Sequence, residues 1–211
     1  MFVLTLTQRD AGSHGDRVDE LLAALATHPA AHPFRRSWGD EAIGAVSSPD
    51  AAVAAALVAL RQGGKEGRRF SIGIGVGPVT MAPDGSLTGQ GPARSRRAVE
   101  RCSRQAIPLG VEAGPAGVAF EGMPSAPESA ASAEAVLRLL GDLVARRSEA
   151  EWAVIDLLIP GVRGQQREVA SALGISVQAV SQALARAGWS REWEARPAAA
   201  LLLGLAAFAV E

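Results

Sequence analysis

The stretch QQREVASALGISVQAVSQALARAG, residues 165–188, decides how the carboxyl-terminal part of this chain folds. Gly174 permits a left-handed backbone that ends a first helix, and Ser176 is a good amino-terminal cap for a second helix. Ala170 is small enough for two helices to cross closely beside it. The pattern therefore predicts a helix-turn-helix. The shared core of its two helices is expected to contain Val169, Leu173, Ile175, Val180 and Leu184.

The side chains outside this core lie mainly on the second helix. Polar side chains in that place can read base edges or hold phosphates in the major groove of DNA. Between residues 161 and 191 there are four arginines and one acid, although the whole chain has a formal net charge of −1. An ordinary hairpin of two helices is the alternative interpretation. We predict that double-stranded DNA is bound by Arg167, Ser176, Val177, Gln178, Ser181, Gln182 and Arg186.

The composition indicates a folded protein with one large domain or two smaller ones. Apolar residues make up 48% of the 211 residues and charged residues 20%, which is enough for a packed core and too apolar for a disordered chain. Cys102 is the only cysteine, so an internal disulfide is excluded and a reducing cytoplasm is expected. The start MFVLTLTQRD is expected to form a strand rather than a signal peptide.

An unbroken run of 13 apolar residues covers residues 198–210. The run is too short to cross a bilayer, which needs about 20 residues, so no membrane partner is expected. We expect protein to cover it, either this chain's own core or a second subunit in a homodimer. The side chains expected at such a dimer seam are Leu201, Leu202, Leu203, Leu205 and Phe208.

The first half of the chain alternates between strand and helix patterns. The expected strands cover residues 2–7, 34–38, 41–46, 70–79 and 107–111, with a further short strand at 117–120. The expected helices cover residues 13–27, 49–62 and 90–104. Residues 112–131 are rich in Pro, Gly, Ala and Ser, which is typical of a linker. We therefore predict an α/β domain at residues 1–124 and a helical domain at residues 125–211.

Glycine alternates with large apolar residues in RRFSIGIGVGPVT, residues 68–80. In a strand, Ile72 and Ile74 point to one face, while Gly73 and Gly75 leave the other face bare. Glycines weaken a strand, so we expect another part of the chain or a ligand to pack closely against them. A tightly packed neighbouring helix and a planar ligand are the two interpretations.

The segment after this strand, GQGPARSRRAVERC at residues 89–102, predicts a strongly basic helix. Its arginines either contact phosphates, of a nucleotide or of a DNA backbone, or form a solvated helix face. We expect Arg94 and Arg97 to face a ligand pocket. The other residues expected to line this pocket are Asp40, Glu41, Gly73 and Gly75.

These two segments, together with Gly39-Asp40-Glu41 at a predicted hairpin turn, make the first half of the chain similar to the nucleotidyl cyclase and GGDEF-type fold. With a helix-turn-helix behind it, the whole chain resembles the SatD-like family. The resemblance implies an α+β protein, in which a ferredoxin-like, nucleotidyl cyclase-type domain precedes an all-α helix-turn-helix domain. It extends over nearly all of the chain and is poorest at the amino terminus.

Active cyclases of this fold hold two divalent metal ions on two acidic residues, one at the end of the first strand and one at the hairpin turn. Asp40, with Glu41 beside it, occupies the hairpin position and is the one candidate metal ligand. The strand-end position falls on Thr7, which is neutral, and Asp10 lies three residues further on. Carboxylates are the ligands that Mg²⁺ and Mn²⁺ need. Asp40 alone is also a common turn residue.

The resemblance and the depleted metal site together predict a transcriptional regulator that binds DNA through its helix-turn-helix. The cyclase-like domain is then expected to be catalytically inactive and to serve dimerisation or the sensing of a small ligand such as a nucleotide, with no resident cofactor. An active, Mg²⁺- or Mn²⁺-dependent nucleotidyl cyclase regulated by its helix-turn-helix is the alternative. A protein-interaction scaffold is a third interpretation.

Overall fold

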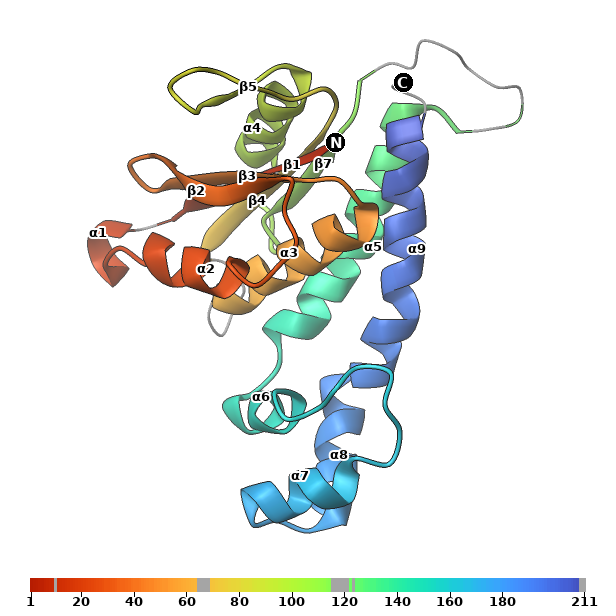
Figure 1. Ribbon diagram of the computed structural model, residues 1–211. Helices are drawn as coiled ribbons and strands as arrows, with labels where there is room; N and C mark the ends of the chain where they lie inside the picture. Colours follow the sequence, from red (N-terminus) through yellow and green to blue (C-terminus); the bar gives the residue numbers. More distant parts are fainter. Residues whose placement is uncertain (10, 64–68, 115–121, 123, 209–211) are drawn as a thin grey trace.

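The computed structural model describes residues 1–211 except residues 10, 64–68, 115–121, 123 and 209–211. It is an α+β protein with a mixed five-stranded sheet and a helical carboxyl-terminal part (Figure 1). The strand order in the sheet is β2 (His32–Trp38), β3 (Glu41–Val46), β1 (Phe2–Gln8), β4 (Phe70–Val76) and β7 (Leu109–Glu112). A separate hairpin consists of β5 (Thr80–Met81) and β6 (Leu87–Thr88).

The helices of the described residues fall into two groups along the chain. Those of the first half are α1 (Ala11–His14), α2 (Val18–Leu25), α3 (Pro49–Gln62) and α4 (Gln90–Cys102). Those of the second half are α5 (Ala126–Ala145), α6 (Glu149–Ile155), α7 (Gln166–Leu173), α8 (Val177–Ala187) and α9 (Trp189–Phe208). Among the described residues, none of these helices is both long and apolar enough to cross a membrane.

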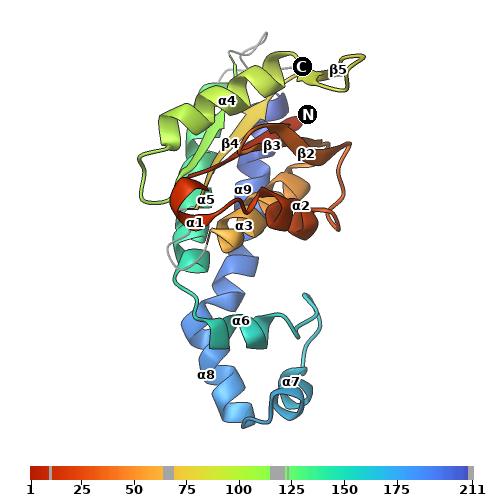
Figure 2. The ribbon, with the colours of Figure 1, turned by 90° about the vertical axis from the view of Figure 1, so that its left-hand side faces the viewer.

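The strand β1 lies at the centre of the sheet and is antiparallel to both β3 and β4, whereas β4 and β7 are parallel. In this register Leu4 lies opposite Gly44 on one side and Ile74 on the other. Strand residues alternate between faces, so Leu4, Leu6 and Ile72 point to the same face, where they are fully buried. Helices α2 and α3 cover that face, and α4 covers the opposite face (Figure 2).

The bare face of β4 is filled by helix α4. A Cβ atom on Gly73 would lie 2.0 Å from the backbone oxygen of Ser95, and a Cβ atom on Gly75 would lie 2.1 Å from that of Gly91. The hydroxyl groups of Thr5 and Ser95 join β1 to α4 at 2.7 Å. Tight helix packing is therefore the confirmed interpretation of the glycine strand, and a planar ligand has no room against Gly73 and Gly75.

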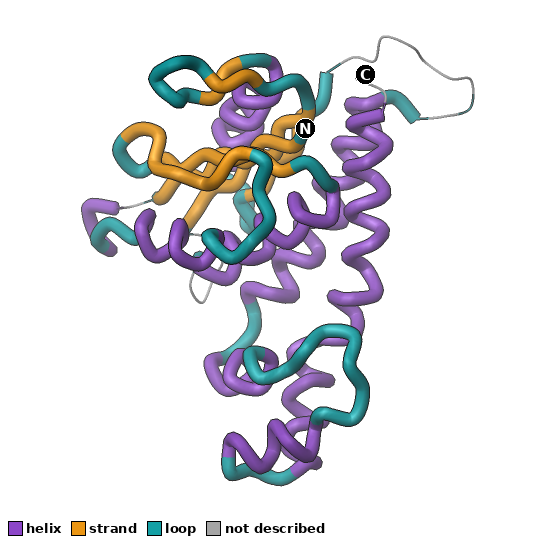
Figure 3. The backbone as a smooth tube through the Cα atoms, in the orientation of Figure 1, coloured by secondary structure: helices purple, strands orange, loops and turns teal. Residues whose placement is uncertain are grey.

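The long helices α5 and α9 pack against each other beside the sheet and extend beyond it (Figure 3). On α9, Ala199, Leu203 and Ala206 are buried in the same hydrophobic core as the sheet. The boundary expected after residue 124 precedes α5, although α5 and α9 share the core of the first half. The division into residues 1–124 and 125–211 stays a prediction.

The expected dimer seam is wrong in one part. Leu203 is fully buried in this chain's own core, and Leu202 packs against that core. The reason is that α9 lies flat against α3 and α5, which cover one side of the apolar run. On the other side, Leu201 is 65% exposed and Phe208 is 60% exposed.

Two local predictions differ from the structure. The helix expected at residues 13–27 is divided into α1 and α2, because Gly15 takes a φ of +72° and the buried Gln8 side chain binds the backbone of Gly15 and Arg17. The β5–β6 hairpin was not expected, since its strands are only two residues long. The short strand expected at 117–120 lies outside the described residues.

Replacing Gly75 by Ala is expected to lower the free energy of unfolding by about 3 kcal/mol, because the new methyl group meets the backbone of Gly91 and Ser95. Urea denaturation measures the change. Gly12→Ala is the matched control, since a Cβ atom there has nothing within 4 Å. Equal stability of the two variants would contradict the close packing of α4 on β4.

Candidate nucleic-acid interface

The helices α6, α7 and α8 form a unit with its own small core. The buried residues of this core are Val154 on α6, Val169 and Ala170 on α7, and Val180 and Ala183 on α8. Leu158, Leu173 and Leu184 pack against it. We call helices α6–α8 with their connecting loops the three-helix unit. It lies at the end of the molecule far from the sheet (Figures 1 and 2).

The turn between α7 and α8 has the geometry that the sequence predicts. Gly174 takes a φ of +65° at the end of α7, and the Ile175 N–H donates to the carbonyl of Ala170 at 3.0 Å. The Ser176 hydroxyl accepts from the Ala179 N–H at 3.1 Å and caps α8. The placement of Ile175 in the core was wrong: its side chain is 41% exposed, because it lies in the turn and outside the crossing of the two helices.

Six of the seven residues expected to contact DNA have exposed side chains. They are Arg167, Ser176, Val177, Gln178, Gln182 and Arg186. Ser181 is half-buried, and its hydroxyl donates to Oε1 of Gln166 at 3.0 Å, so it joins α8 to α7. The exposed side chains of α8 therefore form a surface of two glutamines, one valine, one alanine and one arginine.

Arg186 on α8 forms an ion pair with Glu151 on α6, the first helix of the three-helix unit. Its Nε lies 3.4 Å from Oε1 of Glu151, a long contact between a mostly exposed arginine and a mostly buried glutamate. The pKa of Glu151 is lowered, first by the hydrogen bond from the Ser148 N–H in the capping box and then by Arg186. The glutamate therefore stays charged at neutral pH, and the ion pair is weak enough for Arg186 to change partner.

The three-helix unit is attached to the rest of the molecule through polar contacts with α3 and α9. Arg61 on α3 forms a two-pronged ion pair with Asp156, at 2.6 and 2.7 Å. The Trp152 ring lies under the guanidinium groups of Arg61 and Arg147, at 4.1 and 4.9 Å from its centroid. Arg147 donates from Nε to the carbonyl of Ala187 at the end of α8, at 3.0 Å, and forms a fully buried ion pair with Glu192 of α9 at 2.5 Å. These contacts are not evident from the sequence, because Arg61 and Asp156 are 95 positions apart.

The positions to which the cyclase resemblance assigns metal ions hold few acidic residues in this structure. Asp40 is an exposed residue of the β2–β3 turn, and Glu41 pairs with Arg96 at 3.3 Å. Thr7 lies opposite Glu41 in the β1–β3 register, and Asp10 is outside the described residues. In the part of the chain that the structure describes, no three His, Cys, Asp or Glu side chains are grouped so that they could hold a metal ion.

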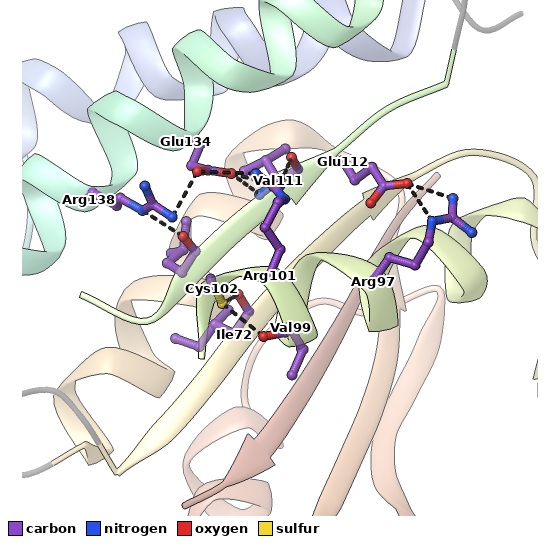
Figure 4. A network of polar contacts seen from close by, with 10 residues as sticks. Ile72, Arg97, Val99, Arg101, Cys102, Val111, Glu112, Glu134 and Arg138 are labelled. Atoms are coloured by element: carbon purple, nitrogen blue, oxygen red, sulfur yellow. Dashed lines mark hydrogen bonds and ion pairs between the residues drawn. The ribbon is translucent and has the colours of Figure 1, made fainter. Parts of the chain in front are cut away.

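The arginines of α4 bind the protein itself. Arg94 is buried and donates to the carbonyl of Val76 at 2.6 Å, and Arg97 pairs with Glu112 at 2.6 Å. Arg101 reaches Glu134 of α5 at 3.0 Å, in the network shown in Figure 4. Arg94 and Arg97 both attach α4 to the ends of strands β4 and β7, and a ligand pocket at these two residues stays a prediction.

Glu134 is the centre of this network (Figure 4). Its carboxylate accepts from the Val111 N–H at 2.8 Å and pairs with Arg101 and Arg138. Nearby, burial raises the pKa of the Cys102 thiol to about 11, and the thiol donates to the Ile72 carbonyl. Cys102 is thus a protonated core residue, and the network fixes α5 against β7.

Comparison with known proteins gave no match to a family model, to a curated protein or to a solved structure. The functional argument therefore depends on the geometry of the chain itself.

Replacing Glu192 by Leu is expected to lower the free energy of unfolding by about 3–5 kcal/mol, because it leaves the buried Arg147 without its carboxylate. Thermal or urea denaturation measures the loss. Glu194→Leu, two residues along α9 at an exposed position, is the control and is expected to change stability little. A Glu192 variant as stable as the control would show that the buried pair does not hold α9 in place.

Proposed function

We propose that this chain is a transcriptional regulator that reads double-stranded DNA with helix α8. The observation that carries the proposal is the row of exposed side chains on α8. This helix follows the turn at Gly174, and Ser176 caps its first turn. Recognition helices contact base edges with the residues of their first turns. Val177, Gln178 and Gln182 occupy that part of α8, and their side chains are exposed.

The chemistry of these side chains favours sites with A·T pairs. A glutamine amide can donate to and accept from the N7 and N6 of one adenine, and an apolar side chain such as Val177 fits against the thymine methyl group. Arg167 and Arg186 hold the flanking phosphates, and a phosphate replaces Glu151 as the partner of Arg186.

The sheet part, in the same proposal, is a catalytically inactive module of the nucleotidyl cyclase type. Its support is the strand order β2-β3-β1-β4-β7 with the Gly39-Asp40 turn between β2 and β3, together with the neutral Thr7 at the end of β1. A carboxylate is needed at both positions to hold two metal ions, and Thr7 offers only a hydroxyl. The module then serves dimerisation or ligand sensing.

A homodimer is part of the proposal, because helix-turn-helix proteins bind paired half-sites about one helical turn apart. The outward sides of α5 and α9 are its proposed seam. Leu139 on α5 is 73% exposed and Leu201 on α9 is 65% exposed, while Ala131, Ala135 and Ala198 are small and exposed on the same two helices.

Gln178→Ala is expected to reduce the preference for the cognate site over a mutated site by about 1–3 kcal/mol, because one set of base contacts is lost. Arg186→Ala is expected to weaken binding to all sequences alike. The cognate DNA site is first identified from genomic DNA fragments that bind the purified chain. Fluorescence anisotropy then measures the affinity of each variant for that site and for a mutated site. Gln105→Ala, an exposed glutamine beyond α4, is the control. A chain without duplex affinity even at low salt would contradict the proposal.

Leu201→Glu is expected to convert the dimer into monomers, because it places a charge in an apolar seam. Sedimentation equilibrium gives the mass of the particle. Leu157→Glu, another exposed leucine that follows α6, is the control and is expected to leave the dimer intact. Dimers that persist in the Leu201 variant would place the seam elsewhere.

A further inference from the structure

A cleft lies where the sheet part of the molecule meets the three-helix unit. It consists of two adjoining hollows of about 400 and 180 Å³. Both hollows are lined by Arg61 from α3, by Val144 and Arg147 at the end of α5, and by Trp152 from α6. The smaller hollow also reaches α9, so the cleft touches helices from both halves of the chain.

The smaller hollow has mostly apolar walls and a cationic lining. The apolar side chains are Ala54, Leu57, Val58, Ile155 and Trp189. Three guanidinium groups, those of Arg61, Arg147 and Arg196, face one carboxylate, that of Glu192.

The acidic partners of these arginines do not balance them within the smaller hollow. Glu192 accepts from both Arg147 and Arg196, so one negative charge serves two positive ones. Asp156 pairs with Arg61 through both carboxylate oxygens and so balances its charge, although it lines only the larger hollow. The smaller hollow therefore combines apolar surface with one unbalanced positive charge, that of the two arginines that share Glu192.

We propose that this cleft binds a small organic anion with a flat apolar body, of the class of aromatic carboxylates. Burial of the ring against Trp152, Trp189 and the aliphatic side chains stabilises the complex through the hydrophobic effect. The carboxylate lies against Arg196, whose partly exposed guanidinium group shares the Glu192 carboxylate with the fully buried Arg147, so that a charge-assisted hydrogen bond forms there.

The position of the cleft gives this ligand a regulatory role, an effect that rests on the proposed function. Helix α3 belongs to the sheet part, α6 to the three-helix unit, and α9 follows α8 directly after Gly188. A ligand that contacts all three favours one placement of α8 relative to the sheet. Ligand and DNA therefore change each other's affinity by the same factor.

Isothermal titration calorimetry of the full chain tests the site with 2-naphthoate and with its neutral analogue 2-naphthamide. Naphthoate is expected to bind at one site per chain, and the amide at least about tenfold more weakly, because it lacks the charge that the arginines recognise. Equal affinities, or no saturable binding of naphthoate at millimolar concentration, would overturn the proposal.

Two variants locate the binding site. Ala54→Phe fills the smaller hollow, and Arg196→Gln removes the partly exposed guanidinium group on α9, so that at least one of the two is expected to fold. Circular dichroism verifies folding. Each folded variant is expected to weaken naphthoate binding at least about tenfold. Arg35→Gln is the control, because Arg35 lines a separate polar hollow near Asp84, and it is expected to leave binding unchanged. Unchanged affinity in both cleft variants would place the ligand elsewhere.

Repeating the titration with bound DNA separates the two proposals. A changed naphthoate affinity supports the regulatory role, and an unchanged one overturns it while the site itself remains. Naphthoate binding in a chain that has no affinity for DNA would overturn the proposed function and not the cleft.

Discussion

The buried ion pair between Arg147 and Glu192 is the interaction on which the placement of the three-helix unit depends. Burying two charges is costly, and a pair in the interior is stable only when the geometry is good and the remaining hydrogen-bonding groups are satisfied. Here Arg147 also donates to the carbonyl of Ala187 and Glu192 also accepts from Arg196. Arg147 follows α5 by two residues and Glu192 lies in the first turn of α9, so the pair joins the two long helices beside the end of α8.

Both long helices extend from the Arg147–Glu192 ion pair to the hydrophobic core that they share with the sheet. At its far end α9 buries Leu203 in the core of the sheet, and α5 is fixed to β7 by the Glu134 carboxylate. The three-helix unit has a separate core, so its internal shape does not depend on the sheet. Its placement does, because Arg61 of α3 binds Asp156 and lies over the Trp152 ring. The three-helix unit is thus connected to the sheet through α3 and through the two long helices.

The sequence predicted those features that depend on neighbouring residues. Gly174 and Ser176 act within one turn of backbone, and each was found where the pattern indicated. Contacts between distant segments were not predictable. Whether the glycines of β4 face a helix or a ligand depends on α4, and whether Arg97 is free depends on Glu112. The predicted burial of Ile175 was wrong for a related reason, since a hydrophobic residue in a turn can lie inside or outside a helix crossing.

Under the proposed function, the distribution of charge explains why two copies of the chain are needed on DNA. Most arginines of α4 are paired within the chain, and the acids of α6 lie in the same unit as the arginines near α8. The nonspecific attraction to phosphates is therefore small for one chain, since each phosphate contact adds only a modest share of the binding free energy. Base contacts from a single short helix add little more. Two recognition helices on one duplex double both contributions, and the exposed apolar side chains of α5 and α9 are the part of the surface suited to bring two chains together.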